Sequence, residues 1–177
     1  MRLFVGLDFP WETKQLLGSL AGGIPGARWV PPENYHMTLR FIGEMPAHRA
    51  EEIDHALAVL RGRAFPLVLT GVGTFDKGGQ ANALWMGVEK NPALEALRSK
   101  IETALQRAGC EPERRRFTPH VTLARLRGPA NGKLAGFVQS RNLFRSGPMP
   151  VEHFVLFSSL LGKEAAVYRP EVEYALE

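Results

Sequence analysis

A short pattern that contains both a histidine and a threonine occurs twice in the sequence. Residues 36–39 (HMTL) recur as residues 120–123 (HVTL), 84 residues further along. Because histidine titrates near pH 6.5, one imidazole can accept a proton while another donates one. A threonine hydroxyl can donate a hydrogen bond to a bound oxyanion. The two motifs together therefore suit acid/base cleavage of a phosphate diester, which needs a base, an acid and donors for the non-bridging oxygens.

Both motifs lie in segments that alternate apolar and polar residues, which is typical of a strand with one buried face. In such strands His36 and Thr38 share one face, and His120 and Thr122 share the corresponding face. The apolar residues between them point to the other side. A repeat of this length in a chain of 177 residues predicts two similar halves, with the two polar faces opposite each other across a pseudo-twofold cleft.

A structural role and a metal site are the alternatives to acid/base chemistry at the motifs. A single His-x-Thr is commonly a half-buried strand histidine bonded to its neighbour, but a second copy followed again by leucine makes that role less favoured. A zinc site usually needs three or four His, Cys or carboxylate ligands, and threonine is a poor ligand. The lone Cys110 cannot form an internal disulfide or a cysteine zinc site. The sequence therefore predicts neither a metal nor a cofactor.

The rest of the chain interleaves predicted strands and helices. Helices are expected after Pro10, after Pro46 and from Asn91 to Gly109, whereas residues 128–147 give no clear signal. Because several connections are too short for a parallel crossover, we expect an α+β fold with antiparallel sheets. The predicted strands are residues 2–8, 28–30, 35–43, 65–75, 82–88, 117–127, 151–161 and 165–176.

Length and composition fit one globular domain, residues 1–177, made of two similar lobes. No run of about 18 apolar residues is present, and the start lacks the apolar stretch of a signal peptide, so we expect a cytoplasmic protein without a membrane segment. The net charge is +4. Residues 108–145 hold eight basic and two acidic side chains, a local excess that would attract a polyanion.

With their flanks, the two motifs resemble the 2H phosphoesterase superfamily, and within it the RNA 2′,3′-cyclic phosphodiesterases, also called 2′-5′ RNA ligases. This likeness implies a bilobal fold of two antiparallel sheets with outer helices and a cleft that carries both motifs. It also implies metal-independent hydrolysis of an RNA terminal 2′,3′-cyclic phosphate to a 2′-phosphate, and in some members 2′-5′ joining of RNA without ATP. The segments that carry it are RLFVGLD (2–8), RWVPPENYHMTLRFIGE (28–44), FTPHVTLAR (117–125) and VEHFVLFSSLL (151–161).

The resemblance also implies roles for single residues. His36 would give a proton to the leaving ribose oxygen and His120 would take one from water. Geometry or the reverse reaction can exchange these two roles, and the sequence does not decide between them. Thr38 and Thr122 would hold the phosphate oxygens.

Three further residues are substrate-binding candidates. Arg125 matches an arginine of the family that contacts phosphate, although strict alternation places it on the face opposite His120, so that role needs a bulge, a strand end or a long side chain. Arg40 shares the face of His36 by alternation and competes for the same role. Phe4 is a candidate for packing against a nucleobase.

The expected binding partner is RNA that ends in a 2′,3′-cyclic phosphate or contains a 2′-5′ linkage, and we expect a monomer. Two alternatives remain open. One is an RNA module that holds a 3′ end without turnover, and the other is a 2H phosphoesterase that acts on small cyclic nucleotides. Turnover of a nucleoside or RNA 2′,3′-cyclic phosphate separates the enzymes from the binding module.

Overall fold

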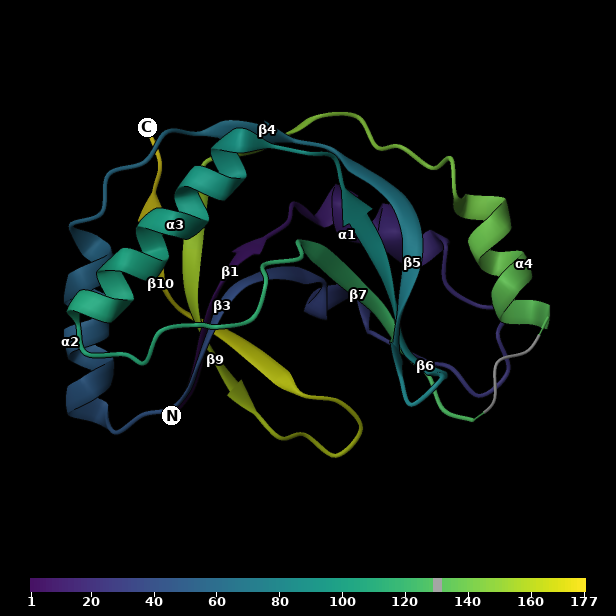
Figure 1. Ribbon diagram of the computed structural model, residues 1–177, viewed down its shortest axis with the longest axis horizontal. Coiled ribbons are helices and arrows are strands. Elements are labelled where there is room, and N and C mark those ends of the chain that lie inside the picture. Colours follow the sequence, from purple (N-terminus) through teal and green to yellow (C-terminus); the bar gives the residue numbers. More distant parts are fainter. Residues whose placement is uncertain (129–131) are drawn as a thin grey trace.

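The computed structural model describes residues 1–128 and 132–177 and is shown in Figure 1. Strand pairings among the described residues are antiparallel, which confirms the expected α+β class. In chain order the elements are β1 (Arg2–Asp8), α1 (Trp11–Ser19), β2 (Arg28–Trp29), the 3-10 helix η1 (Pro32–Asn34), β3 (His36–Glu44), α2 (Ala47–Ala58), β4 (Phe65–Leu67), β5 (Leu69–Lys77), β6 (Gln80–Val88), α3 (Pro92–Arg107), β7 (His120–Arg125), α4 (Gly132–Arg141), β8 (Met149–Val151), β9 (His153–Leu160) and β10 (Val167–Ala175).

The main sheet has eight strands and places the two motif strands side by side at its centre. Its order is β10-β9-β1-β3-β7-β6-β5, and β2 pairs with β7. β3 and β7 join through the pairing of Met37 with Val121. β4 and β8 form a separate two-stranded sheet. At this pairing the main sheet divides into two halves, with β10-β9-β1-β3 on one side and β7-β6-β5 with β2 on the other.

Helices cover the outer side of each half. α2 and α3 lie together at one end of the molecule and α4 lies at the other (Figure 1). α3 packs on β3, α2 on β10 and α4 on β5. On β1, Leu3, Val5 and Leu7 point into the main core, whereas Phe4 belongs to a second small cluster on the opposite face. Alternate side chains of β1 therefore point to opposite faces of the sheet. The main core covers one face, and the other face is left for the motif side chains.

The ends of α3 follow the sequence closely. Asn91 accepts hydrogen bonds from the backbone amides of Ala93 and Leu94, and Pro92 occupies the first turn, where it loses no helical hydrogen bond. α4 was not predicted, because its segment lacks a clear apolar stripe. It is held mainly by Phe137, whose ring lies 5.6 Å from that of Trp29.

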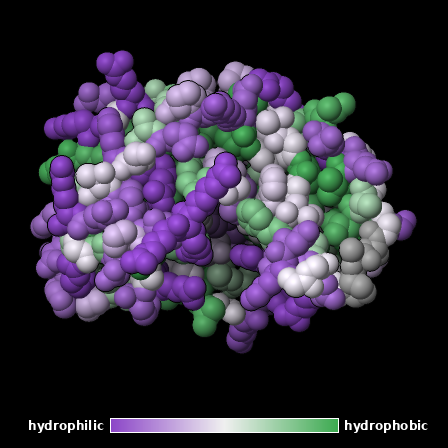
Figure 2. All heavy atoms as spheres, viewed as in Figure 1, coloured by the Kyte–Doolittle hydropathy of each residue, from purple (hydrophilic) through white to green (hydrophobic). Residues whose placement is uncertain are grey.

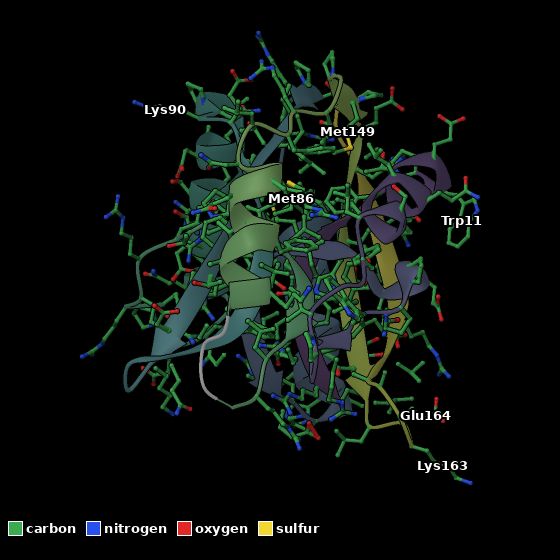
Figure 3. The ribbon with its side chains drawn as sticks, turned by 90° about the vertical axis from the view of Figure 1, so that its right-hand side faces the viewer. Trp11, Met86, Lys90, Met149, Lys163 and Glu164 are labelled. Atoms are coloured by element: carbon green, nitrogen blue, oxygen red, sulfur yellow. The ribbon has the colours of Figure 1, made fainter. Side chains whose placement is uncertain are left out.

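The last two strands form a hairpin with an irregular register. The pairing of β10 with β9 shifts between Pro170 and Val172, as expected because proline has no amide hydrogen for the ladder. Lys163 and Glu164 lie at the tip of the turn, away from the body of the protein (Figure 3). No helix among the described residues is both long and apolar enough to cross a membrane.

Candidate active site

β3 contains a bulge directly after its motif. In the pairing with β1, Thr38 lies opposite Gly6 and Arg40 opposite Val5, so Leu39 is the extra residue. A bulge of this kind reverses the alternation of side chains beyond it. Leu39 and Arg40 are both buried, and Arg40 lies on the core side with Val5. The bulge thus takes Arg40 off the face on which strict alternation placed it with His36, although Arg40 still lines the cavity that contains Thr38 and His120.

β7 contains the matching bulge after the second motif. In the pairing with β6 the register shifts after Thr122, so Leu123 is the extra residue. Leu123 and Ala124 are both buried, and Arg125 is exposed. The bulge returns Arg125 to the face of the motif, which removes the objection from strict alternation. Five residues after each motif histidine, the site face thus carries Phe41 in β3 and Arg125 in β7.

Each motif histidine is oriented by a hydrogen bond to the backbone. His36 Nδ1 donates to the carbonyl oxygen of Asn34 at 2.8 Å, and His120 Nδ1 donates to that of Thr118 at 2.6 Å. Because a carbonyl can only accept, Nδ1 carries the hydrogen in both rings. Nε2 is left to exchange a proton in each case, and in His36 it lies 3.1 Å from Thr38 Oγ1.

The register between the motif strands brings the two polar faces together. Because the strands run antiparallel through the pair Met37 and Val121, the histidine of each motif lies across from the threonine of the other. Thr38 and His120 accordingly line one cavity of about 720 Å³. This cavity is lined by one motif threonine and one motif histidine, so a single cleft that holds both imidazoles and both hydroxyls stays a prediction.

Aromatic rings surround His36. Its ring centroid lies 4.7 Å from Tyr168, 5.0 Å from Phe4 and 6.0 Å from Phe157. Burial lowers the pKa of His36, although the hydrogen bond to Asn34 acts in the opposite direction. Phe4 is 1% exposed, so the expectation that it packs against a nucleobase is wrong. Its ring packs against His36 instead.

His120 has a different environment in the other half of the sheet. The Phe75 ring meets it edge to face at 4.8 Å, and the Trp85 ring lies 6.4 Å away. Burial lowers the pKa of His120, and the positive charge of Arg125 lowers it further.

Arg40, which also lines the cavity, is held in a buried ion pair with Glu102. Its Nε donates to Glu102 Oε2 at 2.6 Å, and its other nitrogens donate to the carbonyl oxygens of Phe41 and Glu111. The two side chains of the pair are 6% and 12% exposed. Burial alone would raise the pKa of Glu102, but hydrogen bonds led by that from Arg40 lower it to about 2.

Several side chains at the cavity were not predicted from the sequence. Phe41 and Phe75 face it from opposite halves of the sheet, and Lys77, Arg115 and Arg116 lie along it. The basic run at 114–116 gave a signal, but nothing in the sequence showed the strand bulge that turns Phe41 toward the site. Among the described residues, no three His, Cys, Asp or Glu side chains gather as a metal site.

Comparison with known proteins places this geometry in a family. Residues 22–162 match the family model of the 2′-5′ RNA ligase superfamily. The RNA 2′,3′-cyclic phosphodiesterase of Aeropyrum pernix is 34% identical over 149 residues, covering 83% of this chain and 84% of that protein. The protein of the same name from Archaeoglobus fulgidus is 30% identical over 173 residues, covering 96% of this chain and 97% of its own length.

Solved structures agree with this result. The crystal structure of E. coli LigT complexed with 3′-AMP superposes with a TM-score of 0.81 at 26% identity, and the match covers 99% of this chain and 97% of that one. The likeness confirms the fold that the sequence led us to expect. On the family model, the two relatives and this shared fold, the chain belongs to the 2′-5′ RNA ligase superfamily.

Proposed function

We propose that the protein hydrolyses the terminal 2′,3′-cyclic phosphate of RNA to a 2′-phosphate without a metal ion. The observation that carries the proposal is the register of β3 and β7, in which each histidine lies across from the threonine of the other motif. Relatives named RNA 2′,3′-cyclic phosphodiesterase, 26–34% identical over most of the chain, support the class of substrate.

In the proposed reaction His120 takes a proton from water as the water oxygen attacks phosphorus. The bond between phosphorus and the ribose O3′ breaks, and His36 gives its proton to O3′. The 2′-phosphate remains on the RNA, and the two imidazoles have exchanged protonation states. Fixing Nδ1–H on the backbone carbonyls of Asn34 and Thr118 supports these roles, because it leaves Nε2 of each ring for the transfer.

The other groups of the site would stabilise the charge that develops on the phosphate. The hydroxyls of Thr38 and Thr122 lie on the faces of the two histidines and can donate to the non-bridging oxygens. Arg125 on the same side of β7 would add a positive charge. Its guanidinium suits two oxygens of one phosphate.

The same transfers describe the joining of RNA ends. An RNA 5′-hydroxyl in place of water attacks phosphorus, gives its proton to His120 and displaces O3′, which His36 protonates. The product is a 2′-5′ linkage, and no ATP is needed because one phosphodiester bond replaces another. Since both motifs belong to one chain, we assign this chemistry to a monomer in which the two lobes form one 2H phosphoesterase domain, residues 1–177.

The test is a turnover assay on a short RNA that ends in a 2′,3′-cyclic phosphate. Protein treated with EDTA is incubated with this RNA, and ³¹P NMR distinguishes a 2′-phosphate from a 3′-phosphate. The proposal expects turnover to the 2′-phosphate. Binding without turnover would identify an RNA 3′-end-binding module instead, and a 3′-phosphate product would contradict the cleavage of the O3′ bond.

A further inference from the structure

The cavity at the motifs extends along a basic segment that the reaction itself does not use. We name residues 111–118 the arginine segment; it runs from the end of α3 across to β7 (Figure 1). Figure 2 shows hydrophilic side chains crossing the middle of this face beside a hollow. The cavity begins at Thr38 and His120 and is also lined by Lys77, Arg115 and Arg116. A strand of RNA bound at the motifs could therefore continue along it.

The charges along the cavity favour a polyanion. No hydrogen bond or ion pair joins the side chains of Lys77 and Arg116 to other described residues, so their charges face solvent. The Arg115 side chain is 77% exposed, and its Nε forms an ion pair with Glu113 Oε1 at 3.2 Å. Besides Glu113, the acidic residue that lines the cavity is Asp76, so basic side chains outnumber acidic ones along it. Exposed arginine and lysine along a groove are typical of contacts to phosphate groups.

Phe41 supplies an apolar surface in the same cavity. The β3 bulge turns it to the motif side, where it is 49% exposed. The Phe4 ring packs against one side of the Phe41 ring, with 5.8 Å between the two ring centroids. The exposed part faces the cavity with Thr38. An exposed aromatic ring between phosphate-binding groups is what a single-stranded nucleic acid needs for stacking of a base.

The arginine segment is held in place before any substrate binds. Arg40 donates to the carbonyl oxygen of Glu111, and the amide of Glu113 donates to Glu102 Oε1 at 2.9 Å. Arg98 lies over the Phe117 ring at 5.5 Å. The buried pair of Arg40 and Glu102 thus fixes the segment to both β3 and α3, which lowers the entropy lost when RNA binds.

We propose that this cavity binds the nucleotides that precede the terminal phosphate of an RNA strand. Arg115 and Arg116 contact backbone phosphates, and Phe41 stacks on a base. The inference rests on the proposed function and adds the residues that select for length: they favour an RNA oligomer over a nucleoside 2′,3′-cyclic phosphate, which is too short to occupy the cavity beyond the motifs.

The test compares two substrates in parallel, a nucleoside 2′,3′-cyclic phosphate and a short RNA with the same terminal nucleotide. We expect the double variant Arg115→Ala/Arg116→Ala to raise KM for the oligomer and to leave kcat/KM for the nucleoside unchanged. The dependence of log KM on log salt should weaken by about 0.7 for each phosphate group that the variant no longer binds. The control is Arg61→Ala/Arg107→Ala, which removes the same charge at exposed positions just after α2 and at the end of α3.

The outcomes separate the two proposals. Turnover of neither substrate by the unaltered protein contradicts the proposed function. Equal kcat/KM for both substrates leaves that function standing and overturns the cavity proposal. The cavity proposal is also overturned if the double variant and the control variant raise KM for the oligomer equally, because the weaker binding would then come from net charge alone.

Phe41 gives an independent readout of stacking. We expect Phe41→Leu to raise KM for the oligomer by about 5- to 100-fold and Phe41→Trp to keep it near that of the unaltered protein. Leucine is apolar but has no ring face, so a purely structural role of Phe41 would leave the two variants alike. Equal KM values for both would therefore contradict stacking at this position.

Discussion

Met37 of β3 lies opposite Val121 of β7, and this pair joins the two halves of the sheet at the strands that carry the motifs. Both residues are fully buried. The backbone pairing fixes the distance and angle between the histidines on either side, since both are attached next to it. Orientation of an acid and a base by a rigid element is a main source of rate enhancement.

The two motif histidines should each be required for turnover. We expect His36→Ala or His120→Ala to lower the rate of cyclic-phosphate hydrolysis by about 10²- to 10⁴-fold. Steady-state rates on the RNA oligomer measure this, with circular dichroism as the check on folding. A folded variant with a rate near that of the unaltered protein would remove that histidine from the mechanism.

The pH profile should peak on the acid side of neutrality. Burial lowers the pKa of both histidines below the ordinary value of about 6.5. One ring must be charged and the other neutral, so kcat/KM is bell-shaped with its maximum between the two pKa values. That maximum lies below about pH 6.5, and the rate falls as the pH rises further because the acid loses its proton. A flat profile from pH 5 to 8, or a maximum above pH 7, would disagree.

The threonine hydroxyls should act on the transition state more than on binding. Thr38→Val and Thr122→Val keep the shape of the side chain and remove the donor. We expect each to lower kcat by roughly 10²- to 10³-fold, as for the loss of one oxyanion donor, with a small change in KM. A rise in KM at constant kcat would assign the hydroxyls to ground-state binding.

Replacement of Arg125 should lower activity, whereas replacement of Arg40 should lower stability. Arg125→Ala should lower kcat/KM by roughly 10- to 100-fold because a charged hydrogen bond to phosphate is lost. Since Arg125 is exposed, the free energy of unfolding should not change. Arg40→Met removes the nearest ion-pair partner of Glu102, which keeps Arg98 at 3.7 Å, so it should cost about 1.5–3 kcal/mol in the free energy of unfolding. Urea titrations and rates on both variants test this. Full stability of Arg40→Met with lost activity would return Arg40 to phosphate binding.

Much of the fold followed from local patterns. The strand Arg2–Asp8 was predicted with the bounds that the structure has, and the start of α3 lay where Asn91 and Pro92 indicated. α4 was missed because Gly132 and Gly136 interrupt its short apolar pattern.

The site was predictable where it depends on alternation and not where alternation breaks. Period-two spacing correctly put each histidine and threonine on one face. The bulges at Leu39 and Leu123 exchange the faces of Arg40, Phe41 and Arg125. A bulge depends on the register with the neighbouring strand, a long-range property that no local pattern encodes.

The most direct test of the two-histidine mechanism is hydrolysis of RNA 2′,3′-cyclic phosphate by EDTA-treated protein, beside His36→Ala and His120→Ala. We predict full turnover to the 2′-phosphate in EDTA and loss of turnover in both variants. Loss of activity in EDTA with rescue by a divalent ion, or turnover by either variant at the rate of the unaltered protein, would contradict acid/base catalysis by these two histidines.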